Sequence, residues 1–313
     1  MEIIVKTRIC EEVGISTDVM KSFLQSALDQ LSEISDGNLW LEKLDAIIIP
    51  DDFGEELIAF QKEKGISEGF TENSYGTAVG KTLQYMVGDT SRFTIFLREY
   101  IMFGLFSEEV KQQSANVIHH ELCHVHDDTI KERMLGLEFV MRMGGDFQTV
   151  LRLHADIIWS EFKATELSSV TKRVEEIQIE HVLKMVERSK PFIDDEIAKY
   201  RIHGEITALF DKVQLEASDL LKQLVYIIGD LVGKGWSDKL EMFSELINRT
   251  YLKEIWTDLV KELMRLNSIY EHWSGVEELD TLGGVVMKLW NVYGLYPNEN
   301  WYISVPAVNP LEG

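Results

Sequence analysis

The chain has 313 residues, enough for one large domain or two modest ones, and its 45% hydrophobic and 27% charged residues are typical of a globular protein. Its 53 acidic and 31 basic residues give a formal net charge of −22, which argues against nucleic acid and anionic membranes as partners. The two cysteines form no disulfide framework, no signal-peptide pattern opens the chain, and no stretch approaches 18 uninterrupted apolar residues, so we expect a cytoplasmic protein without a membrane span.

The N-terminal segment is predicted to form a strand followed by a helix. Residues Ile3–Ile9 are mainly apolar and β-branched, which favours a strand. Ser16 or Thr17 is a good N-cap for a helix that runs to about Ile34, and the cluster Asp36-Gly37-Asn38 ends it.

Three further strands and one helix are expected before the middle of the chain. Leu44–Ile49 is a compact apolar run followed by a proline, which predicts a buried strand. Phe53–Lys64 has the composition of a helix. Tyr75–Val87 and Phe93–Arg98 are rich in β-branched and aromatic residues and predict strands, the second more strongly.

A helix is predicted to begin after Ser107. The hydroxyl of Ser107 can cap it, and Glu108 and Glu109 are favourably placed in its first turn, near the positive end of the helix dipole. No proline occurs between positions 51 and 190, so long helices are permitted.

The next helix is predicted to start at Asp127 or Asp128. Thr129 and Glu132 match the spacing of a capping box, which supports a helix start here. The pair Gly144-Gly145 is expected to break this helix.

The rest of the chain is predicted to be helical. Asp146 can cap a helix that continues to about Ser189, where Lys190-Pro191 interrupts it. From Ile193 to about Ile269 the apolar spacing is again helical, with a break at Gly233-Lys234-Gly235.

These patterns predict an α+β fold in two parts, a domain at 1–200 with a small sheet and an all-helical region at 201–313. Five of the seven tryptophans lie in the last third, where helical spacing favours a role in the core over a substrate cleft. They are Trp236, Trp256, Trp273, Trp290 and Trp301.

The most informative motif is His120-Glu121-Leu122-Cys123-His124, which lies within a predicted helix. Residues four apart on a helix share one face, so the imidazoles of His120 and His124 can bind one metal ion. The carboxylate of Glu121 can then act on water bound to that ion. The pattern predicts metal-assisted hydrolysis.

The residues around the motif resemble the extended signature of the zincin metallopeptidases. That family prefers Val or Thr three residues before the first histidine and uncharged residues between the two. The positions that comply are Val117, Ile118, Leu122, Cys123 and Val125. His126 departs from the pattern, because the family usually has an apolar residue there.

Among zincins, the chain resembles the gluzincin branch, in which a glutamate on a following helix completes the metal site. Glu161, within Trp159–Ala164, fits that role, and 36 residues lie between His124 and Glu161. The resemblance covers roughly residues 40 to 170. A metzincin continuation is absent from the sequence, since positions 127 and 130 are Asp and Ile.

The resemblance implies a zincin-like sheet, with Phe93–Arg98 in the place of a zincin strand, followed by active-site and glutamate helices. It also implies a Zn²⁺ site made by His120, His124 and Glu161, with Glu121 as general base in the hydrolysis of a peptide or protein substrate. We expect an extended substrate to pair with Phe93–Arg98 by strand addition.

Other residues are alternative participants in the site. His154 lies seven residues before Glu161, on the same helical stripe, and is a competing third ligand, a transition-state donor or the fourth ligand of a purely structural metal. Asp128 can orient His124 or, alternatively, cap the next helix. Tyr200 and His203 are possible oxyanion donors.

The remaining motif residues favour structural roles. His119 and His126 lie off the face of the metal-binding pair, and we interpret both as structural or solvent-facing. Cys123 is interpreted as a small buried apolar residue rather than a reactive thiol.

One alternative function keeps the same metal site. Some zincin-like proteins regulate one protein partner by binding or selective cleavage, and the helical last third would then be the partner-binding surface. The sequence carries no signal for oligomeric state or cleavage preference, and imidazole and carboxylate ligands also suit manganese or cobalt.

Overall fold

A computed structural model describes residues 1–6, 10, 14–34, 39–67, 69–70, 72–73, 76–136, 146–173, 177–307, 309 and 311. The fold is α+β, and the chain divides into two compact units. Unit 1 comprises Met1–Arg133 and Lys163–Glu176, and unit 2 comprises Met134–Phe162 and Ile177–Gly313. The predicted boundary near residue 200 lies within a helix of unit 2.

A small mixed sheet forms the centre of unit 1. Its strands are β1 (Glu2–Val5), β2 (Leu44–Ile49), β5 (Gly80–Val87) and β6 (Thr90–Leu97). Among the described residues their order is β1-β2-β6-β5, with β5 antiparallel to β6 and the other pairs parallel. Strand β6 is paired on both sides, so it has no free edge for a substrate. The prediction that an extended substrate pairs with Phe93–Arg98 is therefore wrong.

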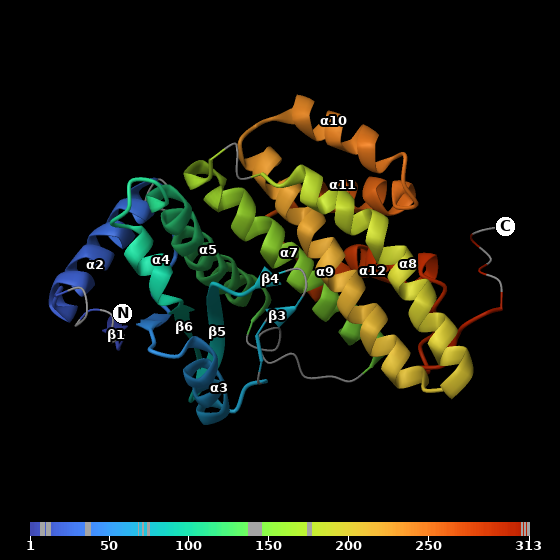
Figure 1. Ribbon diagram of the computed structural model, residues 1–313, viewed down its shortest axis with the longest axis horizontal. Coiled ribbons are helices and arrows are strands. Elements are labelled where there is room, and N and C mark those ends of the chain that lie inside the picture. Colours follow the sequence, from blue (N-terminus) through green and yellow to red (C-terminus); the bar gives the residue numbers. More distant parts are fainter. Residues whose placement is uncertain are drawn as a thin grey trace. The chain divides into compact units, whose positions relative to one another are not determined.

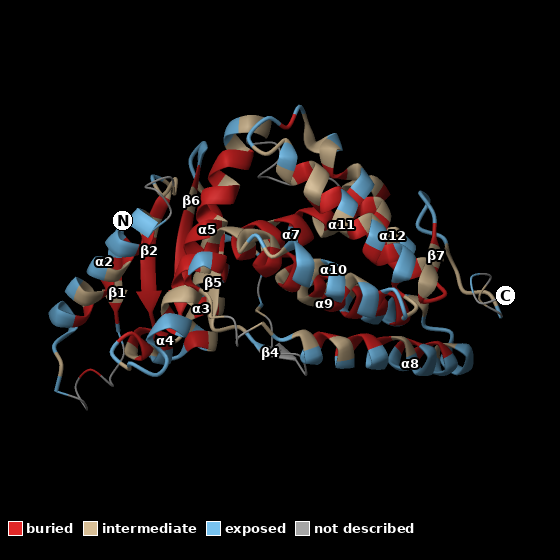
Figure 2. Cartoon of the chain, turned by 90° about the horizontal axis from the view of Figure 1, so that it is seen from above, coloured by how far each residue is buried: buried red, intermediate tan, exposed pale blue. Residues whose placement is uncertain are grey.

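Alternation along β2 explains how the sheet is covered on both faces. Ile47 and Ile49 point into a core shared with α2 (Thr17–Ile34), α4 (Glu99–Gly104) and α5 (Lys111–Leu135). The intervening residues of β2 point to the other face, which α3 (Phe53–Lys64) covers (Figure 1). A strand buried on both faces needs a continuous apolar run, and β2 and β6 are buried along most of their length (Figure 2).

Several predicted elements have the bounds that the sequence suggested. The bounds of α2, β2 and α3 agree with the predicted ranges. The Ser16 hydroxyl accepts a hydrogen bond from the Val19 amide at 3.3 Å, and Asp52 caps α3 by accepting from the Glu55 amide at 2.9 Å. Gly65 ends α3 with φ of 66°, a conformation that favours glycine.

Other strand predictions differ in extent. The first strand is Glu2–Val5 rather than Ile3–Ile9, and residues 7–9 lie outside the described part. The segment predicted as Tyr75–Val87 contains β5 and, before it, a short hairpin of β3 (Glu72–Asn73) and β4 (Gly76–Thr77). The predicted helix breaks at 36–38 and 144–145, and Tyr75, also lie outside the described residues.

Helix α5 is one continuous helix where two were predicted. It begins at Lys111, because residues 108–110 form a turn in front of it, so Glu108 and Glu109 are not in its first turn. It also continues through Asp127 and Asp128, so the predicted helix start there is wrong. Lys131 lies 3.0 Å from the Asp127 carboxylate and 2.7 Å from that of Asp128. Lys131 thus gives both acids an ion-pair partner one turn along the helix, so neither acid marks a helix start.

Helix α7 (Phe147–Ser168) ends earlier than predicted. Asp146 caps it as expected, with its carboxylate accepting from the Thr149 amide at 3.0 Å. At the other end the Thr171 hydroxyl donates to the Ser168 carbonyl at 2.8 Å, and a short 3-10 turn follows. Hydroxyl side chains that bond to nearby carbonyls compete with the helix, which explains the stop.

Pro191 does not interrupt the next helix, contrary to prediction. It lies inside α8 (Ile179–His203), whose buried stripe runs from Val182 and Val186 past the proline to Ile193 and Ile197. A proline costs a helix interior about 3 kcal/mol. The continuous packing of the stripe on both sides of Pro191 outweighs that cost.

The helices of unit 2 pack around α9 (Ile206–Gly233), which contacts α8, α10 (Ser237–Ile247) and α12 (Asp280–Val292). Helix α11 (Lys253–Ser268) packs on α10 and α12, and the short strands β7 (Tyr296–Pro297) and β8 (Ile303–Ser304) follow. The predicted break at Gly233-Lys234-Gly235 separates α9 from α10. In the described part of the chain no helix is long and apolar enough to cross a membrane.

Three of the tryptophans in the last third, Trp256, Trp273 and Trp290, are buried in unit 2. Their position agrees with the predicted role in the core.

Candidate metal centre

The two candidate metal ligands on α5, His120 and His124, lie on the side of the helix that faces away from the sheet. Ile118, Leu122 and Val125 of α5 are buried in the core of unit 1. With 3.6 residues per turn, these three share one face, and His120 and His124 lie on the opposite one. Apolar packing of α5 therefore fixes the direction in which the two imidazoles point.

The two imidazoles converge through the same ring atom. Their Nε2 atoms are 3.1 Å apart, the ring centroids are 4.7 Å apart, and the ring planes are nearly perpendicular, at 89°. Two nitrogens bound to one tetrahedral zinc, each at about 2.0–2.1 Å, are roughly 3.4 Å apart. The separation of the Nε2 atoms in His120 and His124 thus fits joint coordination of one ion.

Glu161, on α7, is the third candidate ligand. It belongs to unit 2, whereas His120 and His124 belong to unit 1. Its side chain is half-buried, as are those of the two histidines. The place of Glu161 in the ligand set stays a prediction.

Tyr226 of α9 holds the candidate glutamate ligand. Its hydroxyl donates a hydrogen bond to Oε2 of Glu161 at 3.0 Å. A hydrogen bond of this kind orients a ligating carboxylate and restricts its rotation.

Glu121 points toward the neighbouring strand β5. Its side chain is 8% exposed, and the Thr82 hydroxyl lies 2.7 Å from its Oε2 and 3.2 Å from its backbone carbonyl. A buried carboxylate is costly unless hydrogen-bonded, so the contact with Thr82 stabilises Glu121 in this position. Glu121 is adjacent to His120 in the chain, and a second element, β5, holds its carboxylate.

The two other histidines on α5 are buried and serve the packing of unit 1. Nδ1 of His119 lies 3.1 Å from the Thr171 hydroxyl, and Nδ1 of His126 accepts a hydrogen bond from the Trp40 amide at 2.9 Å. Burial lowers the pKa of each to about 4, with smaller contributions from the charges of His120 and Lys163 respectively. Both rings are therefore neutral near pH 7, in agreement with a structural rather than a solvent-facing role.

Cys123 is fully buried, and burial raises the pKa of its thiol well above its ordinary value. A thiol in this state is a poor nucleophile, because the thiolate is the reactive form. The position agrees with the prediction of a small buried apolar residue.

The alternative site residues have other partners. His154 Nε2 lies 3.2 Å from the amide oxygen of Gln214, and its ring packs edge-on against Trp290. Asp128 pairs with Lys131 at 2.7 Å.

Tyr200 and His203 lie at the end of α8, where the Tyr200 carbonyl accepts from the Gly204 amide at 2.7 Å and His203 Nδ1 accepts from the Glu205 amide at 2.9 Å. These bonds close the helix terminus, and the role of the two side chains as oxyanion donors stays a prediction.

Sequence reasoning missed Thr82 and Tyr226. Thr82 lies 39 positions from Glu121 in the chain, and Tyr226 lies 65 positions from Glu161. Neither stands in a local motif, so only the fold reveals its contact with the site.

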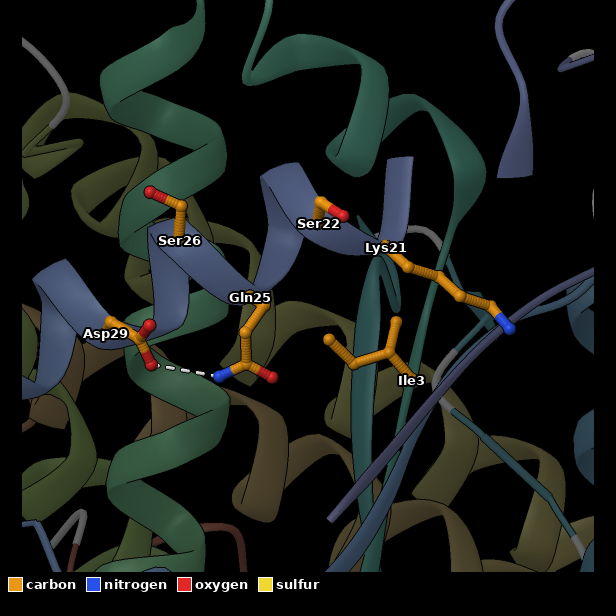
Figure 3. Close-up of a pocket in the computed structure, with 6 residues that line it drawn as sticks. All are labelled: Ile3, Lys21, Ser22, Gln25, Ser26 and Asp29. Carbon is orange, nitrogen blue, oxygen red and sulfur yellow. Dashed lines mark hydrogen bonds between the residues drawn. The ribbon is translucent and has the colours of Figure 1, made fainter. Parts of the chain in front are cut away.

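A surface hollow in unit 1 lies apart from these residues. It is formed by the exposed side of α2 and by β1, and Gln25 donates to Asp29 across part of it at 2.9 Å (Figure 3). Its lining residues are Ile3, Lys21, Ser22, Gln25, Ser26 and Asp29. It contains no residue of the predicted site.

Comparison of the chain with protein-family models, with curated proteins and with solved structures gave no match. The function is therefore argued from the residues of the site.

Proposed function

We propose that this protein is a zinc-dependent metallopeptidase of the zincin type, in which His120, His124 and Glu161 hold the ion and Glu121 is the general base. The observation that carries the proposal is that the Nε2 atoms of His120 and His124 lie 3.1 Å apart on one helix, and that β5 holds the carboxylate of Glu121, the residue next to His120.

The donor set favours a catalytic ion over a structural one. Structural zinc sites have four protein ligands, whereas catalytic sites have three and leave one position for water or substrate. Two imidazoles and one carboxylate are a known catalytic set, and His154, the candidate for a fourth ligand, is bonded to Gln214 instead.

The bound ion would supply Lewis acidity, lowering the pKa of a coordinated water to roughly 7 and polarising a carbonyl. Glu121 takes the proton from the water as the oxygen attacks the amide carbonyl, and then gives it to the leaving nitrogen. The two transfers return the carboxylate to its starting state, so one residue serves as base and then as acid.

The edge of the sheet favours an extended peptide as substrate. Within the described residues, β5 is the last strand of the sheet, and its Thr82 contacts Glu121. An extended chain can add to such an edge through backbone hydrogen bonds. We therefore assign substrate pairing to β5 in place of the segment first expected, Phe93–Arg98.

The proposal is tested by measuring zinc in the purified full-length protein by elemental analysis and hydrolysis with a pool of internally quenched peptides. We expect about one zinc per chain, loss of zinc in His120→Ala, and peptide hydrolysis that a chelator abolishes and added zinc restores. A protein that binds no divalent metal, or that hydrolyses peptides equally well after metal removal, would contradict the proposal.

A further inference from the structure

Two residues of β5, Gly80 and Thr82, contact the same carboxylate from one side of the strand. Residues two apart on a strand point to the same face, so both face Glu121 on α5. All three residues belong to unit 1. We infer that Gly80 and Thr82 are positioning residues that fix where the Glu121 carboxylate lies; the inference rests on the proposed function.

Thr82 holds one oxygen of the carboxylate. Its hydroxyl has one proton to donate, and the 2.7 Å distance to Glu121 Oε2 is shorter than the 3.2 Å distance to the Glu121 carbonyl. A hydrogen bond to a charged acceptor at this distance is of the stronger kind. Thr82 thus selects Oε2 as the anchored oxygen and restricts rotation of the carboxylate.

Gly80 provides the space that the other oxygen occupies. A Cβ added at Gly80 would lie 2.7 Å from Oε1 and 2.8 Å from Cγ of Glu121, closer than real Cβ atoms approach. The backbone of Gly80 does not adopt the left-handed conformation that favours glycine. The need for glycine here is therefore steric, and any larger side chain displaces the Glu121 side chain.

The displacement matters because a general base acts only within hydrogen-bond reach of its proton, and a shift of about 1 Å can cost roughly 100-fold in rate. Glu121 is not one of the proposed metal ligands, and its carboxylate is bonded to Thr82, so we expect moving it to leave metal binding intact. Gly80 and Thr82 therefore control the rate of the chemical step and not the affinity for the ion.

The test uses the full chain with Gly80→Ala, Thr82→Val and Thr82→Ser. Thr90→Val, an exposed threonine on the next strand, is the matched control for loss of a hydroxyl. Cobalt(II) affinity is measured by visible absorption, and acetohydroxamate is then titrated into the cobalt form, because its O–H or N–H can donate to a correctly placed carboxylate. Hydrolysis of the peptide pool gives kcat and KM.

We expect unchanged cobalt affinity in every variant. Gly80→Ala should lower kcat roughly 100-fold and Thr82→Val roughly tenfold, with KM unchanged and acetohydroxamate bound more weakly. Thr82→Ser keeps the hydroxyl, so its kcat should be close to the wild-type value. The control Thr90→Val should also have the kcat of the wild type.

Two results separate this inference from the proposed function. If Glu121→Gln is inactive but Gly80→Ala and Thr82→Val keep wild-type kcat, the positioning inference is wrong and the function stands. If Glu121→Gln keeps wild-type activity, the proposed function itself is wrong. Should Gly80→Ala fail to fold, the pair Thr82→Val and Thr82→Ser still decides, because equal kcat in the two overturns the role of the hydroxyl.

Discussion

At the scale of single residues, neighbours in the chain have different proposed roles. His120 and His124 share one face of α5, whereas the carboxylate of Glu121 meets Thr82. Under the proposed function, His120 and His124 would hold an ion and Glu121 would move a proton. A substitution at the third should therefore separate binding from chemistry.

Glu121→Gln is expected to keep its metal and lose catalysis. The amide has nearly the shape of the carboxylate but cannot accept the proton, and general acid–base catalysis contributes about 10²–10⁴-fold. We expect kcat on the peptide pool to fall by about that factor, with metal content by elemental analysis equal to that of the wild type. Loss of the metal in this variant would show that Glu121 is a ligand instead.

Tyr226→Phe is expected to weaken metal binding. The change removes the hydrogen bond to Glu161 Oε2, and loss of a partner that orients a ligand typically costs 10–100-fold in affinity or activity. Competition with a chromogenic zinc chelator measures the affinity. Tyr200→Phe, which removes a hydroxyl at the far end of α8, is the control and should bind zinc as the wild type does. Equal affinity in the two variants would remove Tyr226 from the site.

At the scale of elements, the sequence predicted those whose ends and faces are encoded locally. The cap at Ser16 and the apolar run of β2 depend on adjacent residues, and the bounds of α2 and β2 were predicted correctly. The predictions at Asp127 and Pro191 were wrong because another interaction outweighed a local stop signal. At Asp127 that interaction is the ion pair with Lys131 one turn along the helix, and at Pro191 it is the packing of α8.

Some residues of the candidate site could likewise be predicted from local sequence and others could not. The sequence predicted His120, His124 and Glu161, since motif spacing and family resemblance pointed to them. The two imidazoles converge on one face of α5, and Glu161 stays a prediction. Thr82 and Gly80 could not be predicted, because their contact with Glu121 follows from strand pairing that no local pattern encodes.

Helix α2 offers a test of how unit 1 is held together. Leu24 is fully buried against the sheet, whereas Val19, on the same helix, is 55% exposed. Leu24→Ala should lower the free energy of unfolding by about 2–5 kcal/mol, because a buried leucine loses both its transfer free energy and its packing. Val19→Ala should change it by less than about 0.5 kcal/mol. Urea unfolding followed by circular dichroism measures both, and equal effects would contradict the burial of α2.

The packing of α7 in unit 2 predicts a dependence of stability on pH. Burial lowers the pKa of His154 below its ordinary value of 6.5. His154 therefore binds a proton more readily in the unfolded chain than in the folded one. Its contribution to the free energy of unfolding is complete above about pH 6.5 and is lost as the pH falls toward the folded pKa. In His154→Gln, the fall in melting temperature between pH 7 and pH 5 should be smaller than in the wild type. An identical fall would show that His154 does not contribute.

At the scale of the whole molecule, the net charge of −22 and the metal centre together favour a protein or peptide partner over a nucleic acid. A peptidase and a regulator of one protein partner would share this centre. The two functions differ in which proteins an inactive variant would retain, because an inactive enzyme can still bind its substrate.

Full-length Glu121→Gln used as bait distinguishes these functions. A regulator of narrow specificity should retain one protein that active wild type releases in cleaved form, whereas a general peptidase should retain no single partner. His120→Ala, which loses a metal ligand, is the control, and retention of the same partner by this variant would show that binding does not use the metal centre.

The proposed function requires one zinc ion held by three protein ligands, His120, His124 and Glu161. Anomalous diffraction at the zinc edge from crystals of the full chain locates such an ion. We expect one strong peak about 2.0–2.1 Å from Nε2 of His120, Nε2 of His124 and a carboxylate oxygen of Glu161. A peak elsewhere in the chain, or a zinc bound to the two histidines with Glu161 turned away, would contradict it.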